Sequence, residues 1–195
     1  MADLTVLGLA GSPRRDGNTR ILLDRVLEGA RHRGAAVVFV DLCRLDIAPC
    51  IACDGCWEHE GCVVQDDYQS VYERLVAADR IVLASPIYFM GLTAQAKNFV
   101  DRAQCLWALK YVQRKTIPAP SGGGARYGHL ISVGGAGFRD LFSCAERTFR
   151  AFLDALGARV GDHLLFSRVD ERGAIRAHPT ALAEAYALGE RMVSD

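Results

Sequence analysis

Residues 11–19, which read GSPRRDGNT, combine the residue types that bind a phosphate group. The glycines let backbone N–H groups approach an anion, and hydroxyl, guanidinium and amide groups add further donors. A phosphate monoester presents three acceptor oxygens at one point, which such a group of donors can surround. The donor side chains in this stretch are those of Ser12, Arg14, Asn18 and Thr19. The sequence therefore predicts a phosphate-binding loop.

Two familiar phosphate loops do not fit this stretch. The Rossmann fingerprint spaces its glycines as G-x-G-x-x-G, whereas this chain has Gly8, then Gly11, then Gly17. The Walker loop has four residues between its glycines and then a lysine, whereas here five residues separate the glycines and Asn18 follows. The alternative interpretation is a surface turn in which Asn18 only caps the next helix.

The second chemically distinctive stretch holds four of the seven cysteines, spaced C-x2-C-x2-C-x5-C. Zinc sites usually consist of two well-separated ligand pairs, so this compact set suits zinc poorly. Three thiols at three-residue steps and then a fourth suit the corners of a cubane iron–sulfur cluster, although the usual ferredoxin run ends x3-C-P. The candidate ligands are Cys50, Cys53, Cys56 and Cys62. The other cysteines, Cys43, Cys105 and Cys144, are expected to be small buried apolar residues.

Composition limits the class of protein that can carry these stretches. A chain of 195 residues, half of them hydrophobic, can fill the core of a single domain over 1–195. Its formal net charge of zero argues against nucleic acid or an anionic membrane as a partner. We also expect no membrane span and no secretory signal. Clustered cysteines in a reducing compartment favour redox or metal chemistry, so we expect a cytoplasmic protein.

The elements that position these stretches alternate between strands and helices. Buried strands are expected at residues 4–10, 36–42, 80–84, 129–133 and 160–169. Helices are expected from residue 18 to Gly34 and at 67–78, 93–109, 138–156 and 180–192. Residues 43–66 form a loop that is long for this architecture and contains the clustered cysteines. The loop is thus an insertion after the second strand.

This alternation predicts an α/β fold with parallel strands, right-handed crossovers and helices on both faces. Five strands allow the doubly wound order 2-1-3-4-5, whose ligand crevice lies between strands one and three. The glycine-rich loops after strands one, three and four would meet at that edge of the sheet. The predicted phosphate loop therefore lies where the predicted fold binds ligands.

Three motifs resemble one family. GSPRRDGNT resembles the phosphate loop of the flavodoxin-like NAD(P)H-dependent FMN reductases. SPIYFMGLTAQAKNFVDR, residues 85–102, resembles their second flavin segment, and PCIACDGCWEHEGC, residues 49–62, resembles the cysteine loop of the iron-sulfur flavoprotein branch. The resemblance implies FMN as cofactor, NAD(P)H as co-substrate and one [4Fe–4S] cluster on the four cysteines. Relatives with the same fold carry some of these cysteines without a cluster, which is the alternative.

The resemblance also implies which residues contact the flavin. Tyr88 and Phe89 can supply walls for a planar ring, and the backbone near Gly91 can approach it closely. The alternative is an ordinary turn whose aromatic residues cover the core. Lys97, Asp101 and Arg102 match the family pattern and are interpreted as structural salt-bridge and interface residues. The implied FMN contacts are Ser12, Pro13, Arg14, Asn18, Thr19, Pro86, Ile87, Tyr88, Phe89, Met90 and Gly91, with Gly134 and Gly135 added by placement alone.

The expected function is an FMN-dependent NAD(P)H oxidoreductase that passes electrons to a quinone, a free flavin or a redox protein. No protein acid or base is required for hydride transfer to a flavin, so His59 and His129 are interpreted as ordinary residues. By resemblance the protein is a homodimer or homotetramer. Two alternatives stay open: an FMN and iron–sulfur electron carrier without nicotinamide activity, and a redox-responsive binding module.

Overall fold

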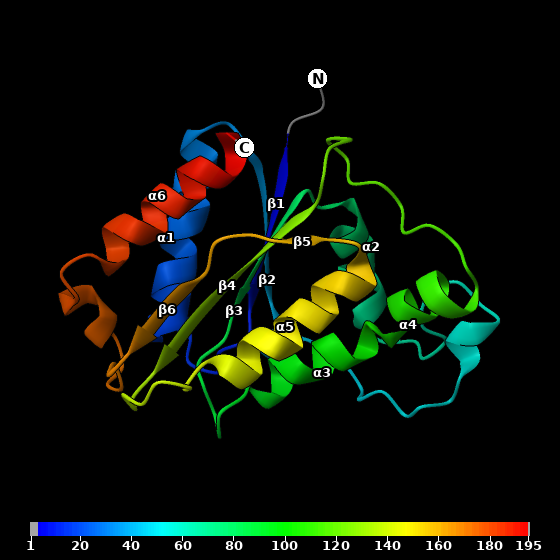
Figure 1. Ribbon diagram of the computed structural model, residues 1–195, viewed down its shortest axis with the longest axis horizontal. Coiled ribbons are helices and arrows are strands. Elements are labelled where there is room, and N and C mark those ends of the chain that lie inside the picture. The colour runs from blue at the N-terminus through cyan, green and yellow to red at the C-terminus, as the bar shows by residue number, and fades with distance from the viewer. Residues whose placement is uncertain (1–3, 195) are drawn as a thin grey trace.

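A parallel sheet forms the centre of the protein, whose structure is a computed structural model that describes residues 4–194 (Figure 1). Within these residues the strand order is β2-β1-β3-β4-β5, with β6 also paired to β4. This order and the parallel pairing confirm the predicted doubly wound fold. The strands are β1 Thr5–Ala10, β2 Ala36–Asp41, β3 Arg80–Ala84, β4 Tyr127–Gly134, β5 Arg159–Val160 and β6 Leu164–Ser167.

Helices cover both faces of the sheet, as predicted (Figure 1). One face carries α1 and α6, and the other carries α2, α3 and α5. None of the helices within residues 4–194 is both long and apolar enough to cross a membrane. The α-helices are α1 Asn18–His32, α2 Tyr68–Ala77, α3 Ala94–Arg102, α4 Gln104–Trp107, α5 Ser143–Leu156 and α6 Ala181–Ser194. Short helical turns are η1 Leu42–Arg44, η2 Gly55–Trp57, η3 Ala108–Val112 and η4 Ala174–Ala177.

The uninterrupted apolar run of β1 has a simple structural cause. Alternate side chains of a strand point to opposite faces, and here both faces are covered by helices. Leu7 and Leu9 belong to the core under α2, α3 and α5, whereas Val6 and Ala10 belong to the core under α1 and α6. Because β1 is buried on both sides, its end is held rigidly where the phosphate loop begins.

The predicted strand at 160–169 is wrong as a single strand, because the structure divides it into β5 and β6. Both pieces pair with β4, β5 at its start and β6 at its end. Between them the imidazole Nδ1 of His163 accepts a 3.1 Å hydrogen bond from Leu130 N–H, which a strand carbonyl would otherwise accept. A side chain thus replaces one backbone partner, and the fifth position of the sheet is filled by two short strands.

Two predicted helices also begin or end elsewhere. The helix expected at 138–156 begins at Ser143, because residues 138–142 form a turn after the glycines of β4. The helix expected at 93–109 is divided at Ala103 into α3 and α4. Thr93 accepts a hydrogen bond from Ala96 N–H and caps the first of these helices. The bend at Ala103 lets α4 continue beneath the cysteine loop.

Candidate functional site

The loops after β1, β3 and β4 converge on one cleft at the carboxyl ends of the strands. Its empty volume is about 480 Å³, and it is open to solvent. Sequence-predicted residues that line it are Ser12, Arg14, Asn18, Thr19, Pro86, Ile87, Tyr88, Gly134 and Gly135. Sequence reasoning missed four further lining residues, which are Gly17, Val133, Val169 and Asp170. The predicted residues Pro13, Phe89, Met90 and Gly91 do not line it.

The phosphate-loop end of the cleft is a tight backbone cradle. Gly11 N–H donates to Ala84 O at 2.8 Å, and the Thr93 hydroxyl donates to Gly11 O, so the loop is tied to β3 and α3. A Cβ at Gly17 would lie 3.1 Å from both Arg14 O and Ser12 Oγ. Only glycine therefore fits comfortably at the point where the loop turns into α1.

The donors of this cradle face the N-terminus of α1. Thr19 is 1% exposed and Ser12 is 8% exposed, whereas the Arg14 side chain is exposed. The first N–H groups of a helix lack partners within the helix and carry partial positive charge. Hydroxyls, backbone N–H groups and one guanidinium thus surround a small volume that suits an anion with several oxygens.

Asn18 has a role that the sequence did not indicate. It does not cap α1, which begins after Gly17 without a side-chain cap. Its Nδ2 instead donates to Glu171 O at 2.9 Å, and its Oδ1 accepts from Ile175 N–H at 3.2 Å. Asn18 therefore holds residues 171–175 against the start of α1, and this segment carries Asp170 to the edge of the cleft.

An ion pair reinforces the same contact. The Arg172 guanidinium binds the Asp16 carboxylate, and this hydrogen bond holds the pKa of Asp16 below its usual value. On the other side, a Cβ at Gly135 would lie 3.0 Å from the Asp170 side chain, so the glycine leaves room for it. Val169 and Asp170, held in place by residues 171–175, thus form a wall of the cleft that neither composition nor spacing indicates.

The opposite end of the cleft is apolar and aromatic. Ile87 N–H donates to Val133 O at 2.9 Å, which fixes the segment after β3 to β4. Tyr88 and Gly91 exchange two 3.0 Å backbone hydrogen bonds, and Phe89 and Met90 between them have φ angles of 47° and 68°. Positive φ at both central positions is the geometry of a type I′ turn, which costs energy for residues other than glycine. The turn leaves Phe89 fully exposed and Tyr88 half exposed beside the cleft.

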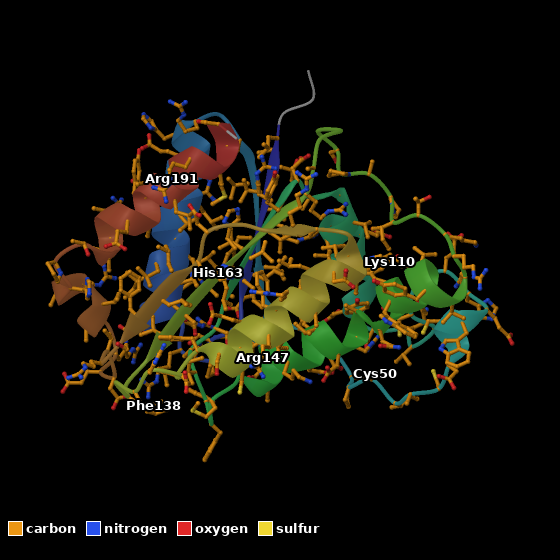
Figure 2. The ribbon with its side chains drawn as sticks, in the orientation of Figure 1. Cys50, Lys110, Phe138, Arg147, His163 and Arg191 are labelled. Carbon is orange, nitrogen blue, oxygen red and sulfur yellow. The ribbon has the colours of Figure 1, made fainter. Side chains whose placement is uncertain are left out.

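The four clustered cysteines line a second cavity, next to α3 and α4. In Figure 2, Cys50 is labelled at the lower right of the view, and Phe138, which follows β4, is labelled at the lower left. Cys50 and Cys53 are exposed, Cys56 and Cys62 are half buried, and all four are free thiols. Within residues 4–194 no three ligands come close enough to hold a single metal ion.

The remaining cysteines follow the prediction only in part. Cys105 is buried, lines the same cavity and lies 3.7 Å from the Tyr68 hydroxyl. Burial raises its pKa to about 12, so it stays a neutral thiol. Cys43 is half buried, and Cys144 is exposed on α5, so the prediction of a buried Cys144 is wrong.

The cysteine loop has a defined backbone. Ala52 and Asp54 have φ angles of 50° and 56°, so the chain turns sharply between the first three cysteines. A Cβ at Gly55 would lie 2.5 Å from the Val63 side chain, which shows how closely the middle of the loop packs against its last part. Gln113 donates 2.9 Å hydrogen bonds to Cys56 O and His59 O. The loop is thereby held in place from outside.

Burial raises the pKa of the Cys56 thiol, and the neighbouring Cys62, Cys50 and Cys53 sulfurs raise it further. Thiolates in this cavity would repel one another unless a positive charge balanced them. Two or more metal ions that share sulfide would supply that charge, and thiolate is the ligand they prefer. The donor set therefore fits an iron–sulfur cluster, whose four thiolates lie farther apart than those around a single ion.

Helix α3 connects the two cavities. Thr93 at its start binds the phosphate loop, and Arg102 at its end binds the cysteine loop. Lys97 and Asp101 form the predicted salt bridge, at 2.7 Å, on the exposed face of this helix. Arg102 pairs instead with Asp66, which holds the base of the cysteine loop. The salt-bridge part of the interpretation from the sequence is confirmed for these three residues. Their place at an interface stays a prediction.

The two histidines considered earlier lie outside the cleft. His129 lies near the start of β4, away from the ligand edge, with its Nδ1 3.1 Å from Asp162 O. Burial lowers its pKa to about 4, so it is neutral at physiological pH. His59 lies in the cysteine loop. Neither is placed to move a proton at the cleft.

The sequence is similar to that of known flavoproteins. The model of the NADPH-dependent FMN reductase family matches residues 4–138. Two similar proteins are iron-sulfur flavoproteins from Methanocaldococcus jannaschii and Methanosarcina thermophila. Each is 34% identical to this chain; the alignments cover 64% of this chain and 65% and 66% of those proteins, respectively. A third, from Archaeoglobus fulgidus, is 38% identical over 54% of each chain. The matched part of this chain thus spans between about half and just under two thirds of the length of these relatives.

Solved structures share the fold. An NAD(P)H:quinone oxidoreductase from Methanothermobacter marburgensis superposes with a TM-score of 0.75 over 98% of this chain and 96% of its own, at 18% identity. A flavone reductase superposes with a TM-score of 0.71 over 98% of this chain and 62% of its own, at 21% identity. At these identities the likeness establishes the fold alone. The resemblance found in the sequence is confirmed by the family match and the similar flavoproteins.

Proposed function

Because the chain belongs to the NADPH-dependent FMN reductase family, we propose that it binds FMN in the strand-end cleft and acts as an NAD(P)H oxidoreductase. One observation carries the proposal: a phosphate cradle and an apolar, aromatic wall are two ends of one cleft. FMN has a phosphate at one end and a planar ring at the other, so the two ends match it in order.

The residues of the cleft would divide the binding between them. Ser12, Thr19 and the backbone before α1 hold the phosphate, and Arg14 closes over it from the solvent side. Tyr88 and Ile87 form the wall against which the ring packs. When bound, FMN supplies hydride and single-electron chemistry, so the protein binds and orients rather than donating protons. The open side of the cleft leaves room for a nicotinamide to approach.

We further propose that the cysteine cavity holds a [4Fe–4S] cluster on Cys50, Cys53, Cys56 and Cys62. The gathering of these four thiols around one cavity supports the proposal. The cluster would supply single-electron transfer, and the exposed edge at Cys50 and Cys53 would face a redox partner. Electrons would otherwise leave from the cleft to a quinone or a free flavin.

Assembly and location follow as proposals from the same features. A homodimer or homotetramer would cover the exposed Tyr88 and Phe89 beside the cleft, so the site would lie near a subunit boundary. The free thiols suit a reducing compartment such as the cytoplasm. Light scattering of the purified protein tests the assembly, and a monomer at working concentration contradicts it.

The deciding experiment starts with anaerobic purification, followed by measurement of flavin and iron content. Steady-state oxidation of NADPH and NADH, with a quinone as artificial acceptor, then tests the enzyme. Turnover that depends on bound FMN is the expected result. Bound FMN without nicotinamide oxidation favours an electron carrier. A protein that binds no FMN contradicts the proposal, and partner binding that depends only on thiol state then favours a redox-responsive module.

A further inference from the structure

Arg102, the last residue of α3, is buried under the cysteine cavity. Its side chain has no exposed surface. It lines the cavity together with Cys50 of the cysteine loop, which is labelled in Figure 2. Its Nη1 donates to Ala48 O at 2.8 Å, and its Nη2 donates to Val64 O at 2.9 Å. One guanidinium thus binds the chain just before the first cysteine and just after the last.

Asp66 completes this clamp. Its two carboxylate oxygens accept from the two Nη atoms, and they also accept from Ala48 N–H at 3.0 Å and Tyr68 N–H at 2.9 Å. Paired guanidinium and carboxylate groups of this kind hold a fixed geometry. The Arg102 guanidinium also lies 4.7 Å from the centre of the Tyr68 ring. Its orientation under the cavity is therefore set on several sides.

The Nε–H of Arg102 has no hydrogen-bond partner among residues 4–194. Leaving a buried donor of a charged group unpaired is costly, and such donors are rare in native proteins. The Cys62 thiol lies beside this guanidinium. A neutral thiol is a poor acceptor, whereas a thiolate is a strong one. The unpaired donor and the Cys62 sulfur therefore line the same cavity, and that sulfur would be a strong acceptor as a metal-bound thiolate.

We propose that Arg102 Nε–H donates a hydrogen bond to the Cys62 sulfur when that sulfur is a ligand of the iron–sulfur cluster. This inference rests on the cluster proposed above. Hydrogen bonds to ligand sulfurs and nearby positive charge favour the reduced, more negative cluster. Arg102 is thus a positioning residue that raises the reduction potential of the cluster. In that reduction one electron enters the cluster, and no bond to Arg102 forms or breaks.

The clamp does not require the Nε–H, which is the fifth N–H donor of the guanidinium. The two Nη atoms already bind Ala48, Val64 and Asp66, which accounts for the fold of the loop. A lysine could keep the positive charge but could not present the Nε–H together with the paired Nη groups. Arg102→Lys thus removes both the clamp and the Nε–H, whereas Asp66→Asn loosens the clamp and keeps the Nε–H, so the pair of variants separates the two roles.

The first test measures the cluster potential in anaerobic, reconstituted protein by redox titration with dithionite. We expect Arg102→Lys to weaken stabilisation of the reduced cluster about tenfold, a shift of about 59 mV to lower potential for one electron. Asp66→Asn removes a negative charge and loosens the clamp but keeps Nε, so it should not lower the potential. Lys97→Gln removes an exposed charge from the same helix and should leave the potential unchanged.

The second test needs no substitution, so it remains valid if Arg102→Lys fails to fold. Wild-type protein labelled with 15N at arginine Nε is reduced by one electron, and pulsed electron paramagnetic resonance measures magnetic coupling between the cluster and nitrogen. We expect one coupled arginine nitrogen, and its absence overturns the inference. An unchanged potential in a cluster-loaded Arg102→Lys protein also overturns it. Wild-type protein that assembles no cluster overturns both this inference and the cluster proposal, whereas FMN binding is judged separately.

Discussion

The Asn18 side chain joins the start of α1 to Glu171, a residue 153 positions later, through a 2.9 Å hydrogen bond. This contact, and a second to Ile175 N–H, hold the wall of the cleft that carries Asp170. The phosphate loop and the wall are therefore one unit, although they come from opposite ends of the chain.

Replacement of Asn18 by Ala should release this wall and weaken FMN binding. A lost neutral hydrogen bond is worth about 0.5–1.5 kcal/mol, and the two bonds of Asn18 act on FMN only through the wall. We therefore expect the dissociation constant to rise by about the equivalent of one such bond, roughly threefold to tenfold. Asn18→Asp keeps the acceptor for Ile175 but loses the donor for Glu171 and adds a negative charge beside the phosphate cradle, so it should weaken binding at least as much. Fluorescence titration with FMN measures the dissociation constants of both variants. Equal affinities for wild type and Asn18→Ala would show that the wall does not depend on this contact.

Replacement of Arg14 by Ala should weaken FMN binding more strongly. A charge-assisted hydrogen bond contributes about 1.5–3 kcal/mol, which corresponds to roughly tenfold to a hundredfold in dissociation constant. Arg15 provides the matched control, since it is exposed and carries the same charge but does not line the cleft. Arg15→Ala should bind FMN almost as wild type does. Similar losses in both variants would indicate a general effect of charge instead of a contact.

Replacement of Tyr88 by Ala should change the flavin spectrum and potential while the phosphate stays anchored, because stacking and anchoring are separate contacts. Phe89 is the control, because it is next in sequence and fully exposed but does not line the cleft. Absorbance, fluorescence and redox titration of the two variants give the comparison. If Phe89→Ala alone alters the flavin, the ring contacts the turn and not the cleft wall.

Replacement of Cys53 by Ser should reduce the iron content from about four per chain and remove the broad visible absorbance beneath the flavin peaks. FMN should remain bound, because Cys53 does not line the strand-end cleft. Cys144→Ser is the control, since Cys144 is exposed and lies outside the cysteine cavity. Iron analysis after anaerobic reconstitution measures the iron content per chain of both variants. Full iron content in Cys53→Ser would exclude this thiol as a ligand.

Burial of His129 predicts a pH dependence of stability. Its pKa is lowered from 6.5 to about 4 in the folded protein, so the unfolded chain binds the proton more readily. The free energy of unfolding should therefore fall by about 3 kcal/mol as pH falls from about 6.5 to 4, and the contribution is complete above that range. Burial lowers the pKa of His163 too, which adds a change of the same sign.

Urea unfolding between pH 4 and 7 measures this dependence, with His129→Gln as the comparison. The variant should lose less stability than wild type over the same range. A parallel fall in both proteins would assign the pH dependence to other groups.

The sequence predicted the strand order and most of the cleft because those features depend on local pattern. Apolar runs such as that of β1 mark strands buried on both faces, and parallel strands bring the following loops to one edge. Ser12 and Thr19 could therefore be assigned to the cleft from the sequence, and Tyr88 from the family resemblance. Gly134 and Gly135, chosen by placement alone, also line the cleft.

Features that depend on contacts between distant residues could not be read in the same way. Asn18 has the residue type of a helix cap, and its pairing with Glu171 leaves no periodic signal. The division of the last strand depends on one imidazole, that of His163, accepting a backbone hydrogen bond. Arg102 matched a motif, but its place under the cysteine loop depends on Asp66, which lies in another element.

The length of α3 fixes the separation between the phosphate loop and the cysteine loop within one subunit. Thr93 and Arg102 are nine positions apart, so at about 1.5 Å per residue the helix separates the two loops by roughly 14 Å along its axis. The rate of electron tunnelling falls exponentially with distance, and a helix cannot be stretched without breaking its hydrogen bonds. One turn added to or removed from α3 would therefore move the cysteine loop by about 5 Å relative to the flavin cleft and change the rate of electron transfer between the two proposed cofactors.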